Sequence, residues 1–70
     1  MTKQEIALAK RFKAKRLKNG HNQLKISAIT GISLTKLGNF ERLKSVPANE
    51  IVYNHLISKV KEYINGSLSN

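Results

Sequence analysis

The sequence predicts an all-α fold, a compact domain of four to five helices, from three features of the 70-residue chain. Apolar residues recur at the three- and four-residue spacing of helix faces, and no stretch shows the alternation of a half-buried strand. Only one proline and four glycines interrupt the chain. There is no cysteine, so packed helices must supply the stability without disulfides or thiolate zinc sites. A chain this short forms one domain, expected over residues 1–66, with a disordered tail at 67–70.

The first helix is expected from about Thr2 to Asn19. Thr2 and Glu5 have the spacing of a capping box, in which each side chain accepts a hydrogen bond from the other residue's backbone. Gly20 predicts the end of the helix, because glycine readily adopts the left-handed conformation that follows a helix. The expected inner face comprises Leu8, Ala9, Phe12 and Arg16.

Residues 23–42 are predicted to form two short helices joined by a tight turn at Gly31. Glycine takes a positive φ at little cost, as such a turn requires. Asn22 is expected to cap the first of these helices and Ser33 the second. The second helix is expected over 34–43. The apolar positions expected to face inward are Ile26, Ile29, Leu37 and Phe40.

The last segment, 47–65, is expected to cover the open side of the other helices, either as one long helix or as two that meet near Asn54–His55. Pro47 suits a first helical turn, because its missing N–H would be unpaired there. Ile51 and Ile57 fall off the main apolar stripe and are expected on the surface, as scattered apolar residues or as a self-association patch. The stripe itself comprises Val52, Leu56, Val60 and Tyr63.

Charge narrows the classes of partner. The chain has 13 Lys and Arg against 4 Glu, a net charge of +9, and a pI of about 10.3. Such an excess of positive charge favours binding to a polyanion, either a nucleic acid or an anionic membrane face. The basic run 10–18 could lie on a membrane, but its few apolar residues are needed for the core. With no apolar run near 18 residues and no signal-peptide core, we expect a cytoplasmic protein, nucleoid-associated when bound.

The outward side of the 34–43 helix has the chemistry to read a DNA major groove. Asparagine can bond adenine, threonine can donate or accept, and leucine can contact a thymine methyl. The residues expected to contact bases are Leu34, Thr35, Gly38 and Asn39. The residues expected to contact phosphates are Lys15, Asn22, Gln23, Ser33, Lys36, Arg42 and Lys44. Phosphate contacts fix the register on the duplex without reading sequence.

Four segments carry a family resemblance: FKAKR (12–16), NGHNQ (19–23), ISAITGIS (26–33) and LGNFE (37–41). Together they resemble the phage Cro and repressor helix-turn-helix family, also called Xre-type. The resemblance implies a lambda-repressor-like fold and a partly buried ion pair between Arg16 and Glu41. It also implies that Gln23 contacts phosphate and steadies the first side chain of the recognition helix, here Leu34 where the family often has glutamine. After Glu41 the family commonly has a glycine-containing loop, whereas this chain continues as RLKS (42–45).

The expected function is that of a small transcriptional regulator of phage or mobile-element type, a Cro-like repressor binding a double-stranded DNA operator as a homodimer. Three alternatives stay open: an excision-control or other DNA-architectural protein, a small RNA-binding protein, and an antirepressor or adaptor that binds protein. An enzyme is not expected, because the sequence has no paired carboxylates, metal cluster, phosphate-cradling glycine loop or nucleophile motif. No cofactor, metal ion or small-molecule ligand is expected either, and the lone His21 is interpreted as a packing or surface residue.

Overall fold

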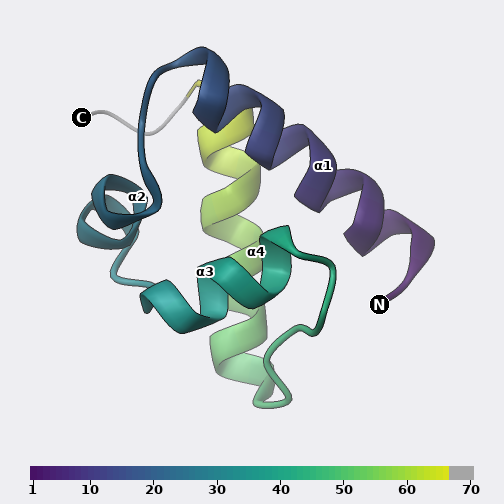
Figure 1. The fold of residues 1–70 in the computed structure, drawn as a ribbon. Coiled ribbons are helices and arrows are strands. Elements are labelled where there is room, and N and C mark those ends of the chain that lie inside the picture. The colour runs from purple at the N-terminus through teal and green to yellow at the C-terminus, as the bar shows by residue number, and fades with distance from the viewer. Residues whose placement is uncertain (67–70) are drawn as a thin grey trace.

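The computed structural model describes residues 1–66, which form four α-helices around one apolar core (Figure 1). The helices are α1 (Lys3–Lys18), α2 (Gln23–Thr30), α3 (Leu34–Glu41) and α4 (Glu50–Ile64). No strand occurs within these 66 residues. The all-α prediction is therefore confirmed, with four helices. The tail predicted at 67–70 lies outside the described residues.

The start and end of α1 follow the sequence signals. The Thr2 hydroxyl accepts a hydrogen bond from the Glu5 N–H at 3.1 Å, and the Glu5 carboxylate accepts one from the Thr2 N–H at 2.8 Å. At the other end, Gly20 has a φ of +71°. The Gly20 and His21 N–H groups there donate to carbonyls of the last helical turn. Satisfying the otherwise unpaired backbone groups at both ends fixes the length of this helix.

The two short helices are also capped as predicted. The Asn22 side chain accepts a hydrogen bond from the Lys25 N–H at 2.8 Å, and the Ser33 hydroxyl accepts one from the Lys36 N–H at 3.2 Å. Gly31 ends α2 with a φ of +76°. The result is a helix–turn–helix in which residues 31–33 join α2 to α3.

Helix α3 ends at Glu41, two residues earlier than the predicted end at Leu43. Leu43 adopts a φ of +61° and donates its N–H to the Phe40 carbonyl at 3.1 Å, while the Lys44 N–H donates to the Asn39 carbonyl at 2.9 Å. These two bonds form the Schellman motif, which usually has glycine at the left-handed position. Leucine there costs roughly 1–2 kcal/mol. The sequence gives no sign of this stop, because leucine is ordinarily a good helix former.

Helix α4 is continuous from Glu50 to Ile64, so the break near Asn54–His55 does not occur. Pro47 lies before the helix and not in its first turn. Asn49 is the capping residue, and its side chain accepts a hydrogen bond from the Val52 N–H at 3.1 Å. In Figure 1 α4 passes behind α3, while α1 crosses the C-terminal half of α4.

The core joins all four helices through large side chains that are almost fully buried. Phe12 of α1 lies with its ring centroid 6.4 Å from that of Phe40 in α3 and 5.5 Å from that of Tyr63 in α4. These aromatic contacts fix α3 relative to both longer helices. Ile57 is half-buried against this core, so its predicted exposure is wrong, whereas Ile51 is 80% exposed. The buried apolar residues are Ala9, Phe12, Ile26, Ile32, Leu37, Phe40, Leu56, Val60 and Tyr63.

Candidate nucleic-acid interface

An ion pair between Arg16 and Glu41 joins the end of α1 to the end of α3. Arg16 Nε and Nη2 donate to the two carboxylate oxygens of Glu41 at 2.7 and 2.8 Å, and the side chains are 11% and 2% exposed. Hydrogen bonding to Glu41 raises the pKa of Arg16, although burial of the guanidinium opposes this. The pair implied by the family resemblance is therefore present, and its two parallel bonds orient α3.

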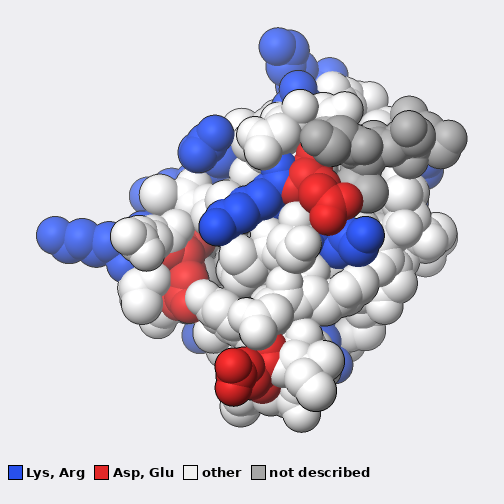
Figure 2. All heavy atoms as spheres, turned by 180° about the vertical axis from the view of Figure 1, so that it is seen from behind, with Lys and Arg blue, Asp and Glu red and all other residues white. Residues whose placement is uncertain are grey.

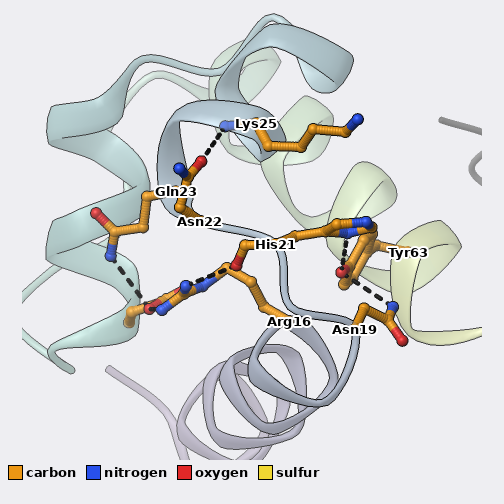
Figure 3. Close-up of polar contacts among 8 residues, drawn as sticks. Arg16, Asn19, His21, Asn22, Gln23, Lys25 and Tyr63 are labelled. Carbon is orange, nitrogen blue, oxygen red and sulfur yellow. Dashed lines mark hydrogen bonds and ion pairs between the residues drawn. The ribbon is translucent and has the colours of Figure 1, made fainter.

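Two further hydrogen bonds extend this ion pair to the start of α2 (Figure 3). Arg16 Nη1 donates to the His21 carbonyl at 3.0 Å, and Gln23 Nε2 donates to Glu41 Oε1 at 3.1 Å. Gln23 therefore steadies the last residue of α3 and not its first, Leu34. In Figure 3 the Gln23 oxygen points away from the ion pair.

The loop before α2 is tied to α4 by Tyr63. The Tyr63 hydroxyl lies 2.8 Å from His21 Nδ1 and accepts a hydrogen bond from Asn19 Nδ2 at 3.1 Å, as Figure 3 shows. His21 is thus a half-buried packing residue. Because His21 also bonds Arg16 through its carbonyl, α4 supports the start of α2 indirectly.

The turn between α2 and α3 is held by two residues, Thr30 and His55, whose contacts with this turn the sequence did not suggest. The Thr30 hydroxyl donates to the Ile26 carbonyl at 2.7 Å and accepts from the Ile32 N–H at 3.2 Å. His55 Nε2 of α4 lies 2.8 Å from the Thr30 carbonyl. No sequence signal links Thr30 with His55, since 25 residues separate them.

The outward side of α3 remains available to a partner. Leu34 is 44% exposed. Thr35 and Lys36 are also exposed, and Asn39 is half-buried. None of these residues belongs to the core, so the side of α3 predicted to face bases is on the surface.

Gly38 is an exception, and its predicted outward exposure is wrong. It is buried, and the Arg42 guanidinium lies over it. Arg42 Nη2 also donates to Asn39 Oδ1 at 3.2 Å. A glycine one turn before a long cation can be covered by that side chain, which the helical spacing alone does not reveal.

The residues predicted to contact phosphates surround α3. Asn22 and Gln23 begin α2, beside the C-terminal end of α3, because Gln23 bonds Glu41. Ser33 and Lys36 lie at the N-terminal end of α3, and Lys44 follows its C-terminal end; Lys36 and Lys44 are both exposed. Lys15 is half-buried in α1. The structure thus places expected phosphate contacts at both ends of α3.

The exposed charges are divided between two parts of the molecule. Ten of the thirteen Lys and Arg residues lie between positions 10 and 49, where the only acid is the buried Glu41. The other three acids are on α4 or, in the case of Glu5, hydrogen-bonded to Tyr53 of α4. On the α4 side, Figure 2 shows both basic and acidic side chains among mainly uncharged residues. The net positive charge therefore comes from α1 and the helix–turn–helix together, with six of the ten basic residues on α1.

Within the described 66 residues, no helix is long and apolar enough to cross a bilayer. The same residues contain no group of three or more His or acidic side chains placed to hold a metal ion. Comparison with protein-family models, curated proteins and solved structures found no match for this chain.

Proposed function

We propose that the protein is a sequence-specific double-stranded DNA-binding regulator that places α3 in the major groove. The observation that carries the proposal is the exposed face of α3, with phosphate-binding candidates at both of its ends. An α-helix fits the major groove, where the base edges present distinct patterns of donors and acceptors. Leu34, Thr35 and Asn39 then face the bases.

The charge distribution supports this orientation. Lys36 in the first turn of α3 and Lys44 just after its end are exposed, so they can neutralise phosphates on either side of the groove. The N-terminal end of α2, capped by Asn22, adds unpaired backbone N–H groups where a phosphate could bind. The buried Arg16–Glu41 pair holds the two helices in a fixed relation, which a recognition element requires.

We further propose that two copies bind a roughly palindromic operator and repress transcription by blocking polymerase. In the family that the sequence resembles, recognition helices of a dimer enter successive major grooves about 34 Å apart. Ile51, 80% exposed at the start of α4, is the best candidate for the contact between copies. A single copy on each bound duplex would contradict the dimer.

Selection of bound sites from random duplexes tests the proposed function. We expect a short half-site that occurs twice with inverted symmetry, and weaker binding to scrambled duplexes. Competition with double- and single-stranded RNA distinguishes a DNA-binding protein from an RNA-binding one, because RNA would displace an RNA-binding protein from duplex DNA. Failure to enrich any sequence, with equal binding to all duplexes, would contradict sequence-specific regulation and favour an architectural role.

A further inference from the structure

The Arg42 side chain lies along α3 instead of extending from its end. An ideal Cβ added at Gly38 would stand 2.9 Å from Arg42 Nη1 and 3.3 Å from Nη2. Arg42 Nη2 also donates to Asn39 Oδ1 at 3.2 Å. The guanidinium therefore rests over the backbone at Gly38, beside Asn39, and any other residue at position 38 would push it away.

This position puts the guanidinium on the side of α3 that carries Thr35 and Asn39. Residues 35, 39 and 42 follow one another at four- and three-residue spacing, which places them on one helical face. The nearby Glu41 does not neutralise Arg42, because both of its oxygens bond Arg16. Arg42 thus keeps its charge and most of its five N–H donors for a ligand.

We propose that Arg42 reads a guanine base in the major groove, and that Gly38 and Asn39 position it. Arginine can donate two parallel hydrogen bonds to guanine O6 and N7, the commonest specific contact between proteins and DNA bases. This proposal rests on the proposed function and replaces the phosphate contact that the sequence suggested for Arg42. It adds a base reader beyond Leu34, Thr35 and Asn39.

The local geometry holds the guanidinium ready to bind on the face of α3 that carries Thr35 and Asn39. A side chain already held against the helix loses less conformational freedom on binding than one that must be ordered from solvent. Gly38 permits this position of the guanidinium, although glycine inside a helix is about 1 kcal/mol less favourable than alanine. Asn39 can keep its bond to Arg42 while donating its own amide N–H groups, because its oxygen accepts only.

The test uses the duplex that the wild-type protein selects from a random pool, and copies of it with 7-deazaguanine at each half-site guanine in turn. This analogue lacks the N7 acceptor and leaves the phosphates unchanged. We expect one such substitution to weaken wild-type binding by at least about 5-fold. The same 7-deazaguanine should not weaken DNA binding by the Arg42→Ala variant, because this variant has already lost the contact. Lys44→Ala, the matched control at the neighbouring cation, should remain as sensitive as wild type.

Gly38→Ala provides a second variant that keeps the fold, because the three atoms nearest to the new Cβ all belong to the movable Arg42 guanidinium. It should show reduced sensitivity to the same 7-deazaguanine, which a purely structural role of Gly38 would not produce. Equal sensitivity of Arg42→Ala and wild type to every 7-deazaguanine would overturn the base contact and leave the proposed function standing. If wild type selects no sequence at all, both proposals fail.

Discussion

Removal of the Glu41 carboxylate should be among the most damaging single changes in this domain. The side chain is 2% exposed and accepts two hydrogen bonds from Arg16 and one from Gln23. In Glu41→Ala the guanidinium, itself 11% exposed, keeps only its bond to the His21 carbonyl. Leaving a buried charge unpaired costs about 3–5 kcal/mol. Domains are stable by only about 5–15 kcal/mol, and one of this size belongs near the lower limit.

Urea unfolding followed by far-ultraviolet circular dichroism measures the loss. Because the cost comes from the remaining charge, the double variant Arg16→Met, Glu41→Leu should recover most of the stability that Glu41→Ala loses. Glu62→Ala is the control, because its ion pair with Lys59 is longer, 3.6 Å, and both side chains are at least 31% exposed. Such pairs contribute less than about 1 kcal/mol. The reasoning is refuted if Glu41→Ala loses no more than this control, or if the double variant is as unstable as the single one.

Three further predictions concern stability, pH and salt. Gly38→Ala should raise the free energy of unfolding by about 0.5–1 kcal/mol, since alanine is the better helix former; a loss in urea unfolding would show that the new Cβ strains the helix. Hydrogen bonding to Tyr53 lowers the pKa of Glu5 below its ordinary 4.5, so this bond stabilises the fold above pH 4.5 and is lost as the pH falls through the lowered pKa. Tyr53→Phe should therefore reduce the acid-induced loss of stability, and an unchanged pH profile would contradict this. Lys36→Ala should reduce the slope of log affinity against log salt by about 0.9, whereas Lys59→Ala on α4 should leave it unchanged.

The N-terminal caps of the first three helices and the ends of the first two were predictable because each depends on residues close in sequence. Thr2 with Glu5, Asn22, Gly31 and Ser33 act within one helical turn, so their spacing alone identifies the helix ends. The inner faces followed from periodicity for the same reason. The Arg16–Glu41 pair, by contrast, was expected only through the family resemblance, since nothing local to either residue indicates the other.

The failures of prediction share a physical cause, which is that tertiary contacts or backbone geometry overrode local preference. Leu43 takes the left-handed conformation that sequence rules reserve for glycine, so α3 ends early. Gly38 has no side chain to orient, and its burial depends on where Arg42 folds. The choice between one helix and two at Asn54–His55 stayed open in the sequence, whereas α4 is continuous there and His55 contacts the Thr30 carbonyl. Each depends on a chain conformation or side-chain position that helical periodicity does not encode.

The separation of charge between the two parts of the molecule gives the domain a substantial electric dipole moment. The segment between positions 10 and 49 accounts for the whole net charge of +9, because acids and bases balance elsewhere. A distant polyanion would therefore exert a torque as well as an attraction, and it would turn the part of the molecule formed by residues 10–49 toward itself before contact. The remainder of the molecule, where acids and bases balance, would face away from the polyanion during such an encounter.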